Sequence, residues 1–213
     1  MKRLGYGLVA AVLTAQVALA TDIRITEWMY QGVGGLGEFV EFTNISGAPI
    51  DMTGWSFDDN SQTPFSVDLS GFGIVQPGES VILTEDDAEF FRTKWALPLT
   101  TKIVGNLGGG SNLGRNDEIN LFDALGNLRD RLTYGDQDFP GTIRTQFFSG
   151  NPATPAALGA NDVYQWVLSA VGDQFGSYTA SSGDVGNPGI YIPEPASLAL
   201  VAVGLLATLR RRS

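Results

Sequence analysis

The sequence predicts an all-β fold, a sandwich of two sheets with one short helix. Short stretches of alternating apolar and polar residues recur through the middle of the chain, and turns rich in glycine, proline or asparagine separate them. Glycine accounts for 27 of the 213 residues, about 13% against ~7% in an average protein. Many short strands accompanied by a single helix suit two packed sheets.

Seven stretches are predicted to form strands. In the first, Ile23, Ile25 and Met29 are spaced at strand periodicity, and the second alternates in the same way. The predicted strands are 23–29, 39–43, 50–57, 80–84, 118–123, 128–134 and 164–168. Turns are predicted at 46–49, 76–78 and 124–127.

One helix is predicted after the fourth strand. Thr84 with Asp87 three positions later resembles a capping box in which Asp replaces Glu. Acidic residues in the first turn suit the positive end of the helix dipole. We therefore expect Phe90, Phe91 and Trp95 to face the core.

The first 20 residues resemble a secretory signal peptide. Lys2 and Arg3 precede an apolar stretch at 8–17, which is too short to span a bilayer comfortably. Small residues at Ala18 and Ala20 then form the pattern that signal peptidase cleaves. We expect cleavage after Ala20 and export across the inner membrane.

The other end of the chain carries a second targeting pattern. An uncharged apolar helix is predicted at 196–209, and as a helix it would be about 21 Å long, short for a hydrocarbon core of ~30 Å. The arginine cluster behind it acts as a cytoplasmic stop. The residues of the pattern are Pro193, Glu194, Pro195, Arg210, Arg211 and Arg212.

This pattern resembles the PEP-CTERM sorting signal of certain Gram-negative bacteria, with Ile192 in place of the usual valine. The resemblance covers 190–213 and implies recognition by an exosortase, an integral-membrane enzyme. It also implies a transient C-terminal membrane anchor and a final place in the cell envelope, on the outer surface or in the extracellular matrix, in association with exopolysaccharide.

The segment between the two signals is strongly acidic. Residues 21–192 hold eight basic and 22 acidic residues, a net charge of −14. Such a body repels phosphate backbones, so we expect no nucleic acid partner. The chain has no His and no Cys, which excludes a Ser-His-Asp triad, a Cys nucleophile and a Cys/His zinc site. We expect no enzyme activity and no cofactor.

A second resemblance concerns this segment. In order along the chain, the segments 26–30, 37–44, 50–57, 77–83, 116–123 and 126–135 resemble a lamin tail domain. The resemblance implies an immunoglobulin-like β-sandwich over 21–189, best matched over 22–136. Beyond Gly135 the likeness rests on Trp166 and a closing Asn187-Pro188-Gly189. Loops at one end of such a sandwich are the expected binding surface.

The glycine-rich segment 32–37 matches the GxGxxG pattern, but a strand follows it where a phosphate site needs a helix, so a flexible hairpin loop is favoured. Glu38 and Glu41 lie three apart on that strand and face opposite sides, so they do not form a catalytic pair within it. Glu41 shares a face with Phe39 and is expected to be buried or hydrogen-bonded to backbone.

Two groups of carboxylates are candidates for calcium. Asp136 and Asp138 alternate, and Asp58, Asp59 and Asn60 cluster in a turn. No DxDxDG loop is present, so solvated turn carboxylates are favoured over a metal site.

The four tryptophans, Trp28, Trp55, Trp95 and Trp166, are expected in the core rather than on a sugar-binding platform.

The sequence thus predicts an exported, exosortase-sorted surface protein without catalytic activity. One alternative is a calcium-dependent adhesin or carbohydrate-binding module. Another is an extracellular hydrolase that uses only carboxylates, for which two of them must converge in a cleft.

Overall fold

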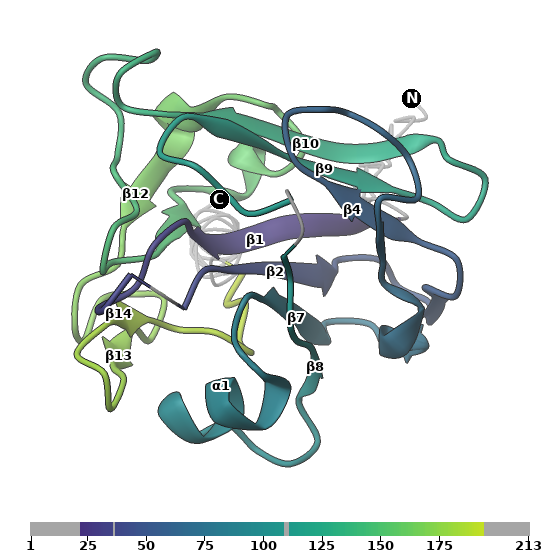
Figure 1. Ribbon diagram of the computed structural model, residues 1–213, viewed down its shortest axis with the longest axis horizontal. Coiled ribbons are helices and arrows are strands. Elements are labelled where there is room, and N and C mark those ends of the chain that lie inside the picture. Colours follow the sequence, from purple (N-terminus) through teal and green to yellow (C-terminus); the bar gives the residue numbers. More distant parts are fainter. Residues whose placement is uncertain (1–21, 36, 109–110, 194–213) are drawn as a thin grey trace, which may run out of the picture.

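Two β-sheets face each other across the main hydrophobic core (Figure 1). The computed structural model describes residues 22–35, 37–108 and 111–193. The strands are β1 (Ile23–Met29), β2 (Phe39–Asn44), β3 (Ile50–Asp51), β4 (Ser56–Asp58), β5 (Val67–Asp68), β6 (Ile74–Val75), β7 (Ser80–Thr84), β8 (Lys102–Val104), β9 (Asp117–Phe122), β10 (Leu128–Tyr134), β11 (Gly150–Pro152), β12 (Trp166–Leu168), β13 (Tyr178–Thr179) and β14 (Val185–Gly186). The helices are α1 (Ala88–Lys94) and the short 3₁₀ turns η1 (Ser70–Phe72), η2 (Pro155–Ala157) and η3 (Val163–Gln165).

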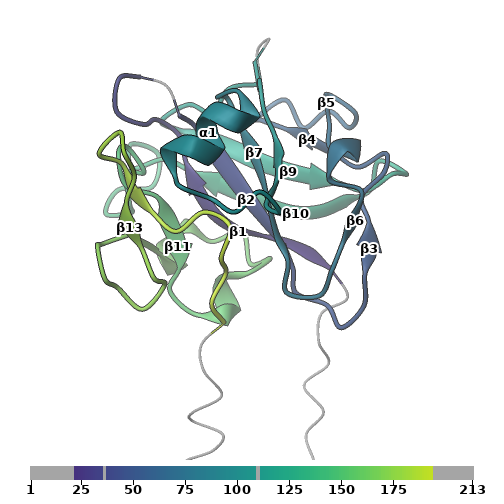
Figure 2. The same ribbon diagram turned by 90° about the horizontal axis from the view of Figure 1, so that it is seen from below.

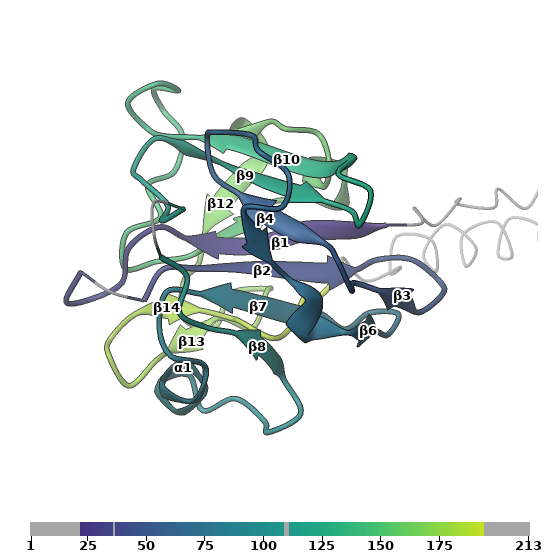
Figure 3. The same cartoon turned by 45° about the vertical axis from the view of Figure 1, so that its right-hand side comes forward.

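The larger sheet has six strands in the order β12-β11-β1-β2-β7-β8, and the smaller has four in the order β10-β9-β4-β5 (Figure 3). Neighbouring strands are antiparallel except β7 and β8, which are parallel. Two further pairs, β3 with β6 and β13 with β14, lie outside these sheets. This confirms the expected all-β sandwich.

The core between the sheets follows from side-chain alternation. On β2, Val40 and Phe42 point into it, and Trp28 from β1 lies against Tyr134 from β10 with ring centroids 3.9 Å apart. Every residue of β2 is nevertheless buried, because the opposite face of the six-stranded sheet is covered as well.

That outer face forms a second apolar cluster under α1 and the β13–β14 hairpin (Figure 2). Trp95 packs edge-on against Phe39 at 5.9 Å and against Tyr178 at 5.6 Å. The buried members of this cluster are Met29, Phe39, Ile82, Phe91, Trp95 and Ala180.

The helix begins three residues later than predicted. Asp87, not Thr84, is the N-cap, and its carboxylate accepts from the amides of Glu89 and Phe90. Thr84 instead ends β7, and its hydroxyl donates to the carbonyl of Glu38 (2.8 Å). Phe90 points outward and is 59% exposed, so its predicted core position is wrong, whereas the burial of Phe91 and Trp95 is confirmed.

The predicted strand at 50–57 is two strands in different sheets. Gly54 has a φ of +77°, a left-handed conformation that interrupts the extended chain. The Trp55 amide donates to the carbonyl of Met52 (3.0 Å) and closes the turn. β3 therefore pairs with β6, while β4 joins the four-stranded sheet.

The region after Gly135 belongs to the same fold. β11 pairs with β1, and β12 pairs with β11, so residues from the C-terminal third extend the six-stranded sheet. The predicted strand at 164–168 is divided between a 3₁₀ turn and β12.

Candidate functional site

The last described residues, Val185 to Pro193, are called here the C-terminal segment. This segment lies on the outer face of the six-stranded sheet (Figure 2). The backbone amide of Asn187 donates to Oε1 of Glu27 (2.7 Å), and the backbone amide of Gly189 donates to Oε2 of Glu41 (2.6 Å). Two carboxyl groups therefore hold the segment just before the residues predicted to form the sorting signal.

Glu27 and Glu41 face each other across β1 and β2, and both are fully buried. Burial raises the pKa of Glu27 well above its ordinary value, and the neighbouring charge of Glu41 raises it further. Burial also raises the pKa of Glu41, against hydrogen bonds from Thr26 and Gly189 that lower it. Two like charges this deeply buried are costly.

Polar neighbours also hydrogen-bond to the carboxyl groups of Glu27 and Glu41. Ser149 donates to Glu27 Oε1, and Thr26 donates to Glu41 Oε1 (2.6 Å). Gly186 passes so close that a Cβ there would lie 2.8 Å from both Glu27 Oε1 and Ser149 Oγ. A side chain at Gly186 would therefore force the Glu27 and Ser149 side chains to shift and disturb these hydrogen bonds. The predicted burial of Glu41 is confirmed, while Glu27 has no signal in the sequence beyond its place on β1.

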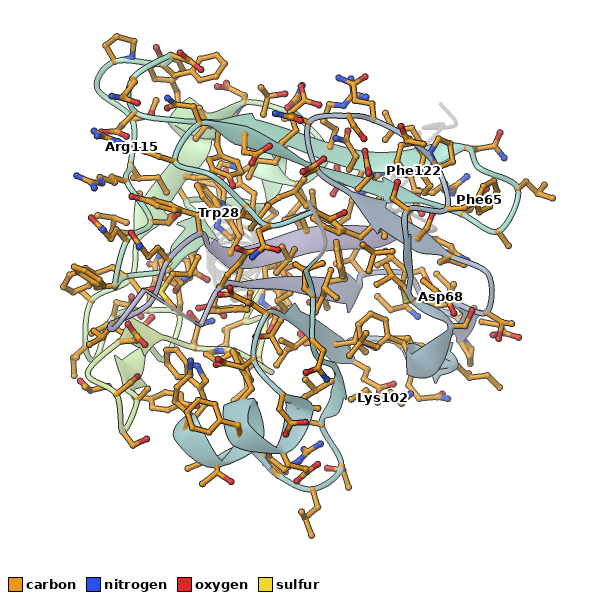
Figure 4. All side chains as sticks on the ribbon, viewed as in Figure 1. Trp28, Phe65, Asp68, Lys102, Arg115 and Phe122 are labelled. Atoms are coloured by element: carbon orange, nitrogen blue, oxygen red, sulfur yellow. The ribbon has the colours of Figure 1, made fainter. Side chains whose placement is uncertain are left out.

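A shallow hollow of about 230 Å³, called here the loop-end hollow, lies at the end of the sandwich that carries the loop after β1. Its polar lining comes from the loop after β1, the start of β2, the end of β7 and the loop before β9: Tyr30, Gln31, Glu38, Glu85, Asn112 and Arg115. In Figure 4, Arg115 lies at this end of the molecule, while Trp28 lies within the core.

Glu38 is the most buried polar residue of the hollow, 3% exposed. Its Oε1 accepts from the Leu113 amide (2.7 Å), whereas Oε2 accepts no hydrogen bond from any described residue. Burial raises the pKa of Glu38 to about 8; the Leu113 amide opposes the rise, and the charge of Glu85 adds to it. At neutral pH this group is therefore a neutral acid that can donate one hydrogen bond.

The glycine-rich loop 32–37 connects β1 to β2, as predicted, and no helix N-terminus follows it. The separation of Glu38 and Glu41 onto opposite faces is also confirmed, since Glu38 reaches Leu113 and Glu41 reaches Gly189.

The carboxylates considered for calcium have other partners. Both oxygens of Asp136 accept from Arg115, at 2.7 and 2.5 Å, and this hydrogen bonding lowers the pKa of Asp136; Asp138 is exposed. Asp58 and Asp59 are buried and accept from Ser61, so they are not the solvated carboxylates that were expected. In the described part of the chain, no three acidic residues gather to hold a metal ion.

All four tryptophans are buried, between 0% and 8% exposed, which confirms their predicted core role. The signal-peptide residues, Ala18 and Ala20 among them, lie outside the described residues. The same is true of the sorting residues from Glu194 onward, including Pro195, helix 196–209 and Arg210 to Arg212. Within the described ranges, no helix is long and apolar enough to cross a membrane.

A family model for the Lamin Tail Domain matches residues 16–136, more than half of the chain. The chain belongs to the lamin tail domain family. A second model, the PEP-CTERM protein-sorting motif, matches residues 192–213. No curated protein and no solved structure matches the sequence.

This lamin tail domain protein is therefore exported and carries a C-terminal sorting and membrane-anchoring signal that an exosortase recognises. Both matched families are non-catalytic. The lamin tail match ends at 136, whereas β11 and β12 of the six-stranded sheet lie beyond it. The region that completes the sheet, together with the C-terminal segment on its outer face, lies outside the lamin tail match.

Proposed function

We propose that this lamin tail domain protein is a non-catalytic module of the outer cell surface that associates with exopolysaccharide after exosortase processing. The observation that carries the proposal is the sorting motif at 192–213, which begins three residues after Gly189. A folded body held closely against its own sorting signal suits a protein whose purpose is to be displayed.

The placement of the chain ends supports the same proposal. β1 begins and the C-terminal segment ends on one side of the molecule, whereas the loop 31–37 lies on the other (Figure 2). With the C-terminal anchor in the membrane, this arrangement would turn the loop end of the sandwich away from the bilayer. The acidic body, with a net charge of −14 over residues 21–192, suits solubility at such a surface.

The test is the intact mass of the protein from its native host, measured separately in inner-membrane, outer-membrane and extracellular polymer fractions. We expect a product that starts at Thr21, ends near Pro193 and carries an added mass in the outer or polymer fraction. A product that retains Leu209 and the arginines in the inner membrane would contradict the proposal.

A variant with Pro193, Glu194 and Pro195 changed to alanine should accumulate unprocessed in the inner membrane. The matched control is Glu89→Gln, an exposed change on α1 that should be sorted like the unchanged protein. Equal sorting of both variants would show that the triplet is not the signal.

The hydrolase alternative has one observation in its favour, because Glu38 and Glu85 line the same hollow and differ in environment. A neutral acid beside a carboxylate is the combination that glycoside hydrolysis requires. Release of new reducing ends from a polysaccharide, abolished in both Glu38→Gln and Glu85→Gln, would establish this alternative in place of the non-catalytic role.

The calcium alternative is tested by thermal melting. Because Arg115 occupies both oxygens of Asp136, we expect millimolar calcium to leave the melting temperature unchanged. A rise that disappears when Asp136 and Asp138 are both changed to Asn would instead support a calcium-dependent adhesin.

A further inference from the structure

The loop-end hollow offers hydrogen-bond donors and acceptors side by side. The Tyr30 hydroxyl accepts from Nε of Arg144 (2.9 Å), which leaves its own proton to donate. Oε1 of Gln31 accepts from Gln146 (2.6 Å), which leaves the Gln31 amide nitrogen to donate. Asn112 lies among the same lining residues and adds an amide carbonyl as an acceptor.

Glu38 supplies the most constrained group of the site. Its side chain is almost entirely buried, one oxygen is fixed by the Leu113 amide, and the other has no partner among the described residues. This second oxygen is not fully buried, so it is open to the solvent of the hollow. A ligand in the hollow could therefore hydrogen-bond to it without any change in the fold.

The charges around the hollow decide the class of ligand. Arg115 is its one basic lining residue and is neutralised by Asp136. The charges with the largest effect on the pKa of Glu38 are acidic: Glu85, Asp117 and Asp59. An anionic ligand would be repelled, and no group of three acidic residues for a metal ion occurs in the described ranges.

We propose that the loop-end hollow binds one sugar unit of an uncharged polysaccharide, and that the Glu38 carboxyl group donates a hydrogen bond to a sugar hydroxyl. Each sugar hydroxyl both donates and accepts, which matches the mixed lining. The volume of about 230 Å³ is below the ~300–1,000 Å³ of drug-sized pockets, which suits a single ring of a longer chain. The proposal rests on the surface role proposed above for its biological meaning, because that role turns this hollow outward.

The test is calorimetric titration of the full chain, purified in a detergent without a sugar head group, with tetrasaccharides of glucose, mannose and galactose. Trigalacturonate serves as the acidic comparison. We expect at least one neutral tetrasaccharide to bind, to be recovered intact and to bind more tightly than trigalacturonate. Absence of binding by every neutral probe, or preference for trigalacturonate, would overturn the proposal.

Two substitutions locate the site. Asn112→Ala changes an exposed residue and should weaken binding several-fold without affecting the fold. Glu38→Ala removes the proposed donor and should weaken binding about tenfold, which corresponds to one hydrogen bond of ~1.4 kcal/mol. Glu89→Gln on α1 is the matched surface control. Unchanged binding in Asn112→Ala and Glu38→Ala would place the ligand elsewhere.

The pH dependence separates a donor from a merely structural residue. If only the neutral acid binds, affinity should fall about fourfold between pH 6.5 and 8.5, because the pKa of Glu38 is about 8. Glu38→Gln keeps a donor and should abolish this fall while it retains the affinity measured at pH 6.5. A Glu38→Gln variant with the same pH profile as the unchanged protein would refute the role of Glu38. The sorting experiment reads out mass and location, so its failure would leave this measurement intact.

Discussion

Replacing Glu38 with glutamine is expected to stabilise the folded protein by about 3 kcal/mol at pH 7 and by almost nothing at pH 4. The carboxyl group is 3% exposed and its pKa in the folded protein is about 8, against 4.5 for an unperturbed glutamate. Ionisation therefore favours the unfolded chain at every pH above 4.5.

The direction follows from proton linkage. A carboxyl with a raised pKa binds its proton more tightly in the folded state. The contribution of Glu38 to the free energy of unfolding is therefore fully present below pH 4.5 and is lost as the pH rises to about 8. At 1.36 kcal/mol per pH unit, the interval between 4.5 and 7 costs about 3 kcal/mol. Glutamine has no such cost, and its carbonyl oxygen can still accept from the Leu113 amide, as Glu38 does at 2.7 Å.

The assay is urea unfolding at half-unit intervals from pH 4 to 8.5, with linear extrapolation to water. Other buried carboxyl groups titrate in both proteins, so the difference between the two curves isolates Glu38. Glu89→Gln, whose side chain is 72% exposed, is the matched control and should follow the unchanged protein. Parallel curves for Glu38→Gln and the unchanged protein over the whole range would refute the reasoning.

Three further changes test other parts of the fold. Burial raises the pKa of Asp130 to about 6, so its contribution to stability is present below its ordinary pKa of 3.8 and is lost as the pH rises through 6. Asp130→Asn should reduce this loss of melting temperature with rising pH, and an unchanged dependence of melting temperature on pH would contradict the prediction. Gly186→Ala should cost about 1–3 kcal/mol in urea unfolding and expose the C-terminal segment to limited proteolysis, whereas Gly108→Ala, with open space around it, should do neither. Phe91→Ala should cost about 3–5 kcal/mol because the ring is fully buried, and Phe90→Ala, 59% exposed, should cost far less; equal losses of stability would count against the two-core description.

The sandwich was predictable where one physical signal dominates. β1, β2 and β10 alternate regularly, and the structure places each within a residue of its predicted bounds. The 50–57 prediction was wrong because apolar residues continue across the turn at Gly54, so periodicity alone could not detect the change of sheet. Thr84 and Asp87 are both good caps, and strand pairing of Thr84 with Phe39 decided between them. β8 has only three residues, and its parallel pairing with β7 has no local signal.

The candidate site was predictable only in part. The glycine pattern at 32–37 matched a phosphate motif, but the strand after it favoured a hairpin loop, and the structure confirms that the loop connects β1 to β2. Glu38 meets Asn112 and Arg115 only after folding, since these residues come from separate parts of the chain. The raised pKa of Glu38 has the same origin, because burial is a property of the assembled sandwich and not of the strand sequence.

The buried pair Glu27 and Glu41 has two opposite effects on the fold. Glu27 and Glu41 reduce stability by being buried, yet the amides of Asn187 and Gly189 that they accept from tie the chain end to the sheet. A strand pair lined with leucine would bury more apolar surface but would offer no acceptor to these amides. The acidic pair thus exchanges some stability for a defined position of the last residues before the sorting motif. From this position the segment runs to the side of the molecule opposite the loop 31–37 (Figure 2), so an anchor at its end leaves the loop-end hollow free to meet a ligand.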